Sequence, residues 1–363
     1  MDAGASLPDI RWLPPIDPQA GDQEPTEGYA LEEATHRSSD ICHKLIFSHS
    51  RVYRRATTMP LFPLGVTYLP FTEPVLNIFE PRYRAMYNDI LFNGARRFMV
   101  CNVDSETGRL AETGVIFYLD ELKEVSEQTQ DRVKYVTQHS VIGRVKLLKV
   151  LNPSVAATRE TYLKAEVEEV VDTDAGDAAD EEEEAVRNLF NELVDVQSSL
   201  GEEPRFTEAV KETVDFGRGE SAESKGLWGT VLLWQQFLEQ RASVVGQKMQ
   251  REIQQEVVSY LKNNDIDNEK VNARGEMRLE DLPEGLRAEI QSIQRRYREE
   301  LEAMESDPYG LQFQAMVQTS SHKERLEVFR GIVDTERKRL AARQTLQSMF
   351  KGIGDGEKKD EEI

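Results

Sequence analysis

Cysteine is scarce in this 363-residue chain, with Cys42 and Cys101 as the only two. Two cysteines exclude a multi-disulfide framework and a four-cysteine zinc site, and this usage suits a reducing compartment. Long hydrophobic runs are also missing, because no segment approaches the roughly 18–20 apolar residues that a membrane-spanning helix needs. The sequence therefore predicts a soluble protein with no membrane partner.

Positive charge is in deficit, since 45 Lys and Arg residues face 66 Asp and Glu residues and the net charge is −21. A field of this sign repels nucleic acid and anionic lipid as a whole, and nucleic acid is an unlikely partner. Two local basic clusters, RVYRR at 51–55 and ARRF at 95–98, keep RNA binding as an alternative function.

The N-terminus lacks the pattern of a targeting segment. Acidic residues run through the first forty positions, which excludes a basic-then-apolar signal peptide and an acid-poor transit peptide. The predicted location is the cytoplasm, or an organelle such as the plastid if a targeting segment is missing from this chain.

Catalytic signatures are absent too. No GxxxxGK[ST] loop is present to hold nucleotide phosphates, and GQKMQ and GRGESAESKG lack its spacing. The neighbours Ser224 and Lys225 would face apart on a helix, which does not suit a Ser–Lys dyad. The possible metal ligands His36, Cys42, His43 and His49 lie close together in the sequence, but their spacing fits no zinc-binding pattern. The sequence predicts no enzyme, no metal and no cofactor.

The pattern of what is present predicts an α+β protein. Residues 1–58 are rich in Pro, Gly and acid and are expected to form a largely disordered acidic arm. Residues 59–172 are expected to form a barrel-like lobe with one inserted helix. Its strands are expected within 59–71, 74–80, 96–104, 114–122, 132–140, 143–151 and 160–171. In the last of these, Leu163, Ala165 and Val167 alternate with Lys164, Glu166 and Glu168, as in a strand with one solvated face.

The chain then becomes acidic and afterwards helical. Residues 173–184 are predicted to be an acidic linker, 185–263 a helical lobe, 277–352 a C-terminal helical extension and 353–363 a charged tail. Apolar residues recur at steps of three and four between Leu227 and Val257 and between Leu286 and Met304. Trp228, Trp234 and Phe237 are expected in the helix core. These helices leave homo-oligomerisation, and a structural scaffold assembled through the C-terminal helices, as a further alternative.

The stretch LNIFEPRYRAMYNDIL, 76–91, predicts a strand end that leads into a helix. Pro81 suits the first helical position, and Glu80 suits the helix dipole and a pair with Arg84 four residues on. Tyr83, Met86, Tyr87, Ile90 and Leu91 form the apolar stripe that is expected to pack on the β-lobe. Direct contact of the exposed Arg82 and Arg84 with a partner is the alternative role.

The segment MPLFPLGVTYLPFTEPVLNIFEPRYRAM resembles the opening of the N-terminal substrate-binding domain of ATP-dependent Lon proteases. The family-signature and candidate partner-contact residues are Leu61, Phe62, Pro63, Leu64, Pro70, Phe79, Glu80, Pro81, Arg82, Tyr83 and Arg84. The resemblance covers 59–172 and, more weakly, the helices to about 263. The ATPase and peptidase domains of a full Lon protease are absent from this sequence.

The resemblance implies a stand-alone Lon substrate-binding domain with a PUA-like β-lobe. Such a module would bind protein without catalysis, recognising unfolded or degron-bearing segments or one specific protein partner in protein quality control. An RNA-binding PUA-like module is the alternative from another class.

Overall fold

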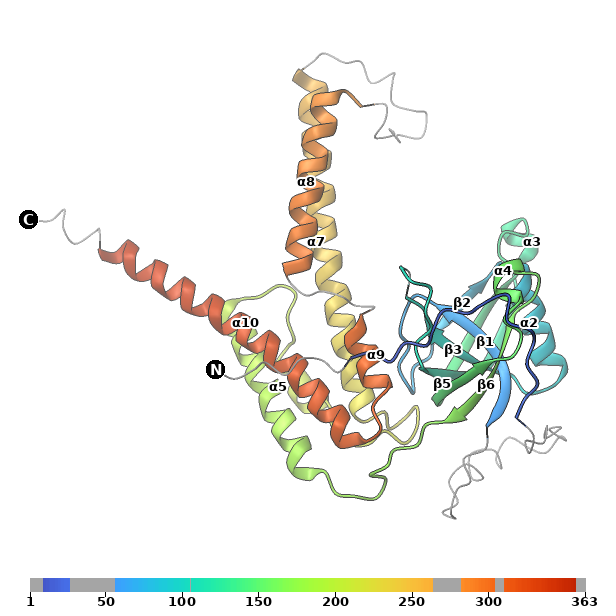
Figure 1. Ribbon diagram of the computed structural model, residues 1–363. Helices are drawn as coiled ribbons and strands as arrows, with labels where there is room; N and C mark the ends of the chain where they lie inside the picture. The colour runs from blue at the N-terminus through green and yellow to red at the C-terminus, as the bar shows by residue number, and fades with distance from the viewer. Residues whose placement is uncertain (1–8, 27–55, 105, 264–281, 304–309, 357–363) are drawn as a thin grey trace, which may run out of the picture. The chain divides into compact units, whose positions relative to one another are not determined.

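The computed structural model describes residues 9–26, 56–104, 106–263, 282–303 and 310–356, and it has an α+β architecture (Figure 1). The strands come first in the chain. They are β1 (Thr57–Leu64), β2 (Val75–Ile78), β3 (Arg97–Asn102), β4 (Thr113–Glu124), β5 (Tyr135–Val150) and β6 (Leu163–Glu169). Helix α2 (Pro81–Phe92) is inserted between β2 and β3, and two single-turn helices, α3 (Ser126–Thr129) and α4 (Val155–Thr158), flank β5.

Five strands close into a barrel in the order β5-β4-β3-β1-β6, because β6 also pairs with β5. The β1–β3 pair is parallel, and the other pairs of the ring are antiparallel. Closure gives every strand of the ring two neighbours, which removes the exposed edges of an open sheet. Strand β2 lies outside the ring and pairs with β5 alone.

Strand β5 is a single element where the sequence predicts two strands, at 132–140 and 143–151. The pairing passes from Phe117↔Val141 to Ile116↔Gly143, so Ile142 is an extra residue on β5. A bulge of this kind bends a strand without ending it. The sequence-based division at Gly143 was therefore wrong, and the bend lets one strand serve β2 and β4 at one end and β4 and β6 at the other.

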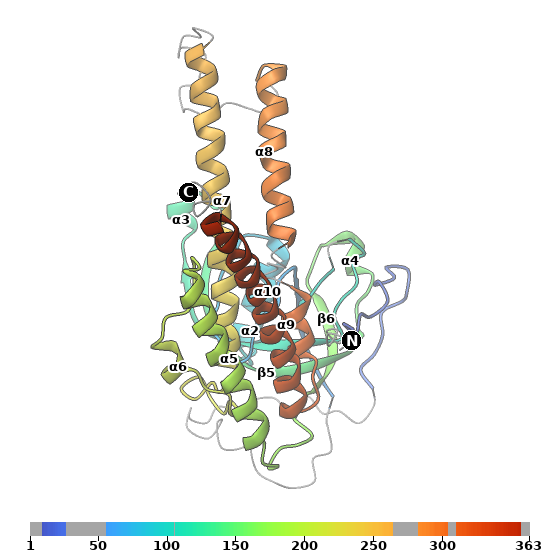
Figure 2. The ribbon, with the colours of Figure 1, turned by 90° about the vertical axis from the view of Figure 1, so that its left-hand side faces the viewer.

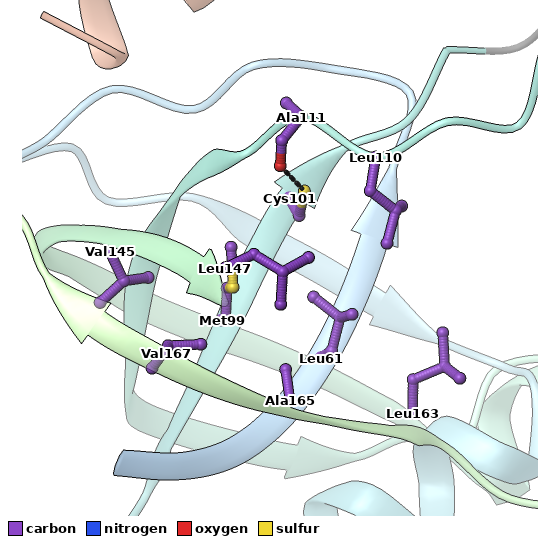
Figure 3. Close-up of a cluster of buried hydrophobic side chains, with 10 residues drawn as sticks. All are labelled: Leu61, Met99, Cys101, Leu110, Ala111, Val145, Leu147, Leu163, Ala165 and Val167. Atoms are coloured by element: carbon purple, nitrogen blue, oxygen red, sulfur yellow. Dashed lines mark hydrogen bonds between the residues drawn. The ribbon is translucent and has the colours of Figure 1, made fainter. Parts of the chain in front are cut away.

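The barrel interior holds one of the buried apolar clusters, which Figure 3 shows. It includes Leu61 of β1, Met99 and Cys101 of β3, Val145 of β5 and Ala165 of β6. The Cys101 thiol donates to the Ala111 carbonyl oxygen at 3.0 Å. Burial raises the pKa of this thiol to about 12, although the Ala111 hydrogen bond lowers it, so Cys101 is a packed, unreactive side chain.

The N-terminal residues 9–26 pack on the barrel, where the sequence predicts a disordered arm. Trp12 forms a β-bridge with Ala111, and Trp12, Leu13 and Ile16 pack against the barrel core. The physical reason is that these few apolar residues gain their burial from the barrel and not from one another. Residues 27–55, most of the remaining arm, lie outside the described residues.

Glu166 shows a second effect of this N-terminal segment. It alternates with the core residues of β6 as expected, but its exposed fraction is only 2%. Its carboxylate accepts hydrogen bonds from the Thr26 hydroxyl at 3.1 Å and the Thr26 backbone N–H at 3.3 Å, and it pairs with Lys149 at 3.1 Å. The expectation of a solvated Glu166 was wrong because residues 9–26 cover this face of the barrel.

The helices that follow are α5 (Asp180–Leu200), α6 (Val210–Thr213), α7 (Leu227–Asn263), α8 (Glu284–Ala303), α9 (Leu311–Val317) and α10 (His322–Gly356). With the rest of the chain they divide into two compact units, each built from segments that are separate in the sequence. One compact unit consists of Met1–Val196, Glu208–Leu232 and Tyr309–Ile363, and the other of Gln197–Thr207 and Leu233–Pro308. The C-terminal segment thus belongs to the same unit as the barrel, and no unit boundary falls at 173–184.

In the barrel-containing unit, α9 and α10 are held against residues far away in the chain. Phe313, Ala315 and Met316 of α9 are fully buried. The Gln314 side chain donates to the Thr113 carbonyl oxygen at 2.8 Å. Helices α5 and α10 lie side by side (Figures 1 and 2), and Arg337 of α10 pairs with Glu192 of α5.

The other unit is built from the long part of α7 with α8. Leu282, Leu286 and Ile290 form a buried cluster against Ile253, Val257 and Tyr260, which confirms two of the predicted helical stripes. Trp234 and Phe237 are buried, and their rings pack at a tilt against the Phe206 ring. They are core residues, as the sequence indicates, and the same holds for Trp228 in the barrel-containing unit.

Candidate functional site

The described residues contain one strand with a single neighbour, β2, and this strand lies in the segment with the family signature. The carbonyl oxygen of Pro74 accepts the His139 N–H at 3.1 Å, and that of Ile78 accepts the Lys134 N–H at 2.9 Å. Leu76 contributes its carbonyl oxygen to the Thr137 hydroxyl at 3.1 Å. Residues 74, 76 and 78 therefore direct their backbone groups toward β5.

By the alternation of an antiparallel pair, Val75 and Asn77 direct their N–H and C=O groups away from β5. No backbone partner meets them within the described ranges. Side chains alternate as well, so Ile78 is buried while Val75 and Phe79 are 61% and 55% exposed. We name the outward backbone of Val75 and Asn77, together with the side chains of Val75 and Phe79, the β2 edge.

The helix start that follows β2 is as predicted, with Glu80 in extended conformation at the N-cap and Pro81 at the first helical position. The predicted Glu80–Arg84 pair is wrong. Arg82 instead pairs with Glu80 at 2.8 Å, and its guanidinium lies 4.5 Å from the centroid of the Tyr83 ring. The Arg82 Nε donates to the Glu80 carboxylate at 2.8 Å, so the arginine two positions along the chain, and not Arg84, is the partner of Glu80.

Arg84 is engaged with a partner that is distant in the sequence. Its Nη1 donates to both carboxylate oxygens of Asp131, at 3.0 and 3.1 Å, and its Nη2 to the Asp131 carbonyl oxygen at 2.8 Å. Its Nε donates to the Phe79 carbonyl oxygen at 3.0 Å. Arg84 thus ties the end of β2 to the turn after α3. It is not the free, exposed cation that a direct partner contact would need.

Tyr83 anchors α2 on the barrel. Its ring stacks on Phe62 of β1 with centroids 3.9 Å apart, and burial raises its pKa to about 12. The stripe Tyr83, Met86, Tyr87 and Ile90 is buried as predicted, whereas Leu91 is partly exposed.

The other family-signature residues have structural positions in the barrel. Leu61 and Phe62 are buried, Pro63 and Leu64 are half-buried at the end of β1, and Pro70 is buried in the turn before β2. Of the eleven signature residues, Phe79 is the one exposed large apolar side chain.

A buried hydrogen-bonded group holds Pro74, the residue before β2. His139 Nδ1 lies 3.2 Å from the Pro74 carbonyl oxygen, and His139 Nε2 lies 2.7 Å from the Tyr87 hydroxyl oxygen. The Thr137 hydroxyl oxygen lies 3.3 Å from the Tyr87 oxygen. The arrangement fits a neutral imidazole that donates from Nδ1 and accepts at Nε2. Burial lowers the pKa of His139 to about 4, against smaller raising effects of Pro74 and Asp120.

Sequence reasoning missed a second group of charged residues, which we name the Asp172 cluster: Arg144, Asp172, Asp174, Arg218, His322 and Arg325. Asp172 pairs with Arg144 at 2.6 Å and with Arg325. Arg144 also donates to the Val317 and Thr319 carbonyl oxygens, at 2.9 and 2.7 Å, where α9 ends. Both guanidiniums lie over the Trp228 ring.

Asp174 completes this cluster at the start of α10. Its carboxylate accepts the backbone N–H groups of His322 and Lys323 at 3.0 and 3.1 Å, and pairs with Arg218 at 2.8 Å. A side chain from outside the helix therefore caps α10. The acidic run, predicted to be a solvated linker, instead holds the C-terminal helices. The sequence of the acidic run does not show which arginines pair with it, because these arginines lie far away in the chain.

The Ser–Lys pair and the His and Cys cluster named from the sequence do not form a site within the described residues. Ser224 and Lys225 lie in the loop before α7. The cluster of His36, Cys42, His43 and His49 and the basic residues 51–55 lie outside the described residues. Within the described part of the chain, no group of three or more His, Cys, Asp or Glu side chains is arranged to hold a metal ion. None of the helices in the described ranges combines the length and apolar composition needed to cross a membrane.

No protein-family model matches the chain, and no curated protein sequence matches it. Several solved structures are similar to part of it, among them the following two. One is a Lon N-terminal domain protein from Xanthomonas campestris, with 19% identity over 49% of this chain and 97% of that chain and a TM-score of 0.28. The other is the N-terminal domain of a Mycobacterium avium complex Lon protease, with 13% identity over 43% and 88% of the two chains and a TM-score of 0.30. Both are Lon N-terminal domains, the family that the sequence resembles.

Proposed function

We propose that this chain is a non-enzymatic protein-binding module that captures unfolded or degron-bearing protein segments through its barrel. The observation that carries the proposal is the β2 edge, where Val75 and Phe79 expose apolar side chains beside the signature residues of the Lon-like segment. Among the other signature residues, Leu61, Phe62, Pro70 and Tyr83 are buried, and Arg82 and Arg84 are paired with Glu80 and Asp131, which leaves this face for a partner. The resemblance of 59–172 to a substrate-binding domain supports the same role.

Binding to an unfolded protein tests the proposal. Reduced, carboxymethylated α-lactalbumin is permanently unfolded and serves as the probe, with native α-lactalbumin as the folded comparison. We expect the wild-type chain to bind the unfolded form and the Val75→Ser/Phe79→Ser double variant to bind about tenfold more weakly, because apolar area is lost. Binding that does not distinguish unfolded from native α-lactalbumin would contradict the proposal.

Phe92 provides a matched control. It is 91% exposed at the other end of α2, so Phe92→Ser removes an equally large apolar side chain. Because α2 has twelve residues, this end lies about 18 Å from the helix start. Phe92→Ser is expected to bind the unfolded probe like the wild type. An equal loss in Phe92→Ser and in the double variant would show that general stickiness, and not the β2 edge, explains binding.

The absence of catalysis is a separate prediction. Because the sequence has no phosphate-binding loop and no nucleophile paired with a base, the purified chain should neither hydrolyse ATP nor cleave a casein substrate above a buffer control. The measurement is phosphate release and peptide release across successive chromatography fractions. An activity that follows the protein peak through every column would disprove this part of the proposal.

The salt dependence of binding distinguishes RNA binding, the alternative function, from capture of an apolar peptide. Phosphate contacts would make the affinity for RNA fall steeply as salt rises, whereas capture of an apolar peptide is insensitive to salt. We therefore expect the affinity for carboxymethylated α-lactalbumin to persist at 0.5 M NaCl. A single-stranded RNA that competes with this probe at low salt only would favour the alternative.

A further inference from the structure

The backbone of β2 sets the kind of ligand that its edge can accept. The outward N–H and C=O groups of Val75 and Asn77 are spaced as in any strand, and each ring strand already has two neighbouring strands. A helix satisfies its own backbone and cannot use these groups, whereas an extended segment can. Val75 and Asn77 are neither proline nor charged, and no strand covers the edge within the described residues, so three of the devices that protect edges from pairing are missing here.

We infer that β2 binds its client by strand addition: an extended segment of another protein pairs with the outward backbone of Val75 and Asn77 and extends the β5–β2 pair. This inference rests on the proposed function and specifies how the client is held. Backbone hydrogen bonds give affinity without regard to sequence, which suits a module that meets many unfolded segments.

The side chains around the edge define the client's composition. Val75, Asn77 and Phe79 are exposed at alternate positions on one face, so the client residues opposite Val75 and Phe79 should be apolar. The cations near Phe79 are already paired, Arg82 with Glu80 and Arg84 with Asp131. At the Val75 end, Glu73 is exposed and has no ion-pair partner within the described ranges. The preferred client is therefore an alternating apolar segment with a flanking Lys or Arg.

A backbone substitution tests strand addition directly. Asn77→Pro removes the outward N–H, while the inward bonds of residues 74, 76 and 78 stay in place, and proline is tolerated on an edge where its nitrogen faces solvent. Asn77→Ala is the matched control, because it removes the same side chain and keeps the N–H. The probe is a fluorescein-labelled peptide, KSVTFTVSK, measured by fluorescence polarisation, with thermal melts of both variants.

We expect Asn77→Pro to weaken binding by about tenfold and Asn77→Ala to leave it nearly unchanged, since a backbone hydrogen bond and its geometry are lost only in the first. Equal affinities of the two variants, both folded, would overturn strand addition. If Asn77→Pro does not fold, binding of N-methylated peptides to the wild-type protein is measured instead. One peptide is methylated at the backbone nitrogens of one edge and a second peptide at those of the other edge. Methylation of one edge should abolish binding and methylation of the other should not, and equal effects of both would overturn the inference.

The charge preference has its own readout. Glu73→Lys should weaken binding of KSVTFTVSK and strengthen binding of its charge-reversed form, ESVTFTVSE. An unchanged ratio of the two affinities would remove Glu73 from the site.

These experiments separate the mode from the function. If unfolded α-lactalbumin binds through Val75 and Phe79 while Asn77→Pro and the methylated peptides have no effect, the proposed function stands and strand addition fails. If neither α-lactalbumin nor the peptide binds the wild-type chain, the proposed function fails.

Discussion

Tyr83 makes the packing of α2 on the barrel measurable at a single side chain. It is 5% exposed and stacks on Phe62, so Tyr83→Ala should lower the free energy of unfolding by about 2–4 kcal/mol through lost aromatic burial. Arg82→Ala removes a partly exposed ion pair and one cation–π contact and should cost less than about 1 kcal/mol. Urea unfolding of the two variants measures both values, and equally small losses would show that α2 is not packed on the barrel.

His139 predicts how acid affects the barrel. Its folded pKa of about 4 lies below the value of about 6.5 expected in the unfolded chain, so the unfolded state binds more protons between these values. The contribution of His139 to stability is full above about pH 6.5 and falls as pH decreases toward 4, by up to about 1.4 kcal/mol per pH unit.

NMR titration of the histidine Cε1 protons measures this pKa, with His139→Gln used to assign the signal. We expect the His139 signal to stay at its neutral position down to about pH 5. A midpoint near 6.5 would mean that the ring is not buried against Tyr87 and Pro74. His322, whose pKa is also lowered by burial, acts in the same direction on stability, so its signal must be resolved separately.

Single residues also show what sequence can and cannot predict. The start of α2 was predictable because proline at the first helical position is a local preference. The partner of Arg84 was not, because Asp131 lies 47 residues away and comes into reach only when the turn after α3 has formed. The β2 edge was only partly predictable. Phe79 was named as a signature residue, but its exposure follows from the pairing of β2 with β5.

Like the single-turn helices α3, α4 and α6, helix α9 was not predicted from the sequence as a separate element. Its seven residues, LQFQAMV, are too few to show a helical period. Gln314 can be buried because its side chain donates to the Thr113 carbonyl oxygen, and this partner lies 201 residues away in the sequence. The strands of the barrel were easier to predict, since alternation in residues such as Leu163, Ala165 and Val167 is a local pattern.

The Asp172 cluster predicts a large stability effect for a single carboxylate. Burial alone raises the pKa of Asp172. The hydrogen bond from Arg325 and the charges of Arg325 and Arg144 together lower it by more, so the pKa lies below its usual value. Asp172→Asn would leave two buried guanidiniums without their anion and should cost about 3–5 kcal/mol. The stabilisation by the native carboxylate is present above about pH 4 and is lost as pH falls through its lowered pKa.

The control for this variant is Asp180→Asn, at the exposed first turn of α5 in the same acidic run. It changes only an interaction with the helix dipole and should cost less than about 1 kcal/mol. Urea unfolding at pH 7 compares the two variants. Similar small losses in both would show that the acidic run is the solvated linker that its composition suggests.

At the scale of the whole molecule, the chain should stay together when it is cut in the acidic run. A protease site inserted at the exposed turn Gly176–Asp177 would separate the barrel strands from the C-terminal helices in sequence. Because Tyr309–Ile363 belongs to the same compact unit as the barrel, we expect the two fragments to co-elute in gel filtration and to separate only in denaturant. A barrel fragment that elutes alone without denaturant would contradict this division.

The pairing of Arg11 with Gln318, 307 residues apart, has a consequence for biosynthesis. At about 5–20 residues per second, a ribosome needs about 15–60 s to pass from the first partner to the second. During this time the barrel strands leave the ribosome without α9 and with their Asp172 carboxylate unmatched by Arg325. The contacts of this unit can therefore be completed only after residues 318 and 325 have been synthesised and have left the ribosome.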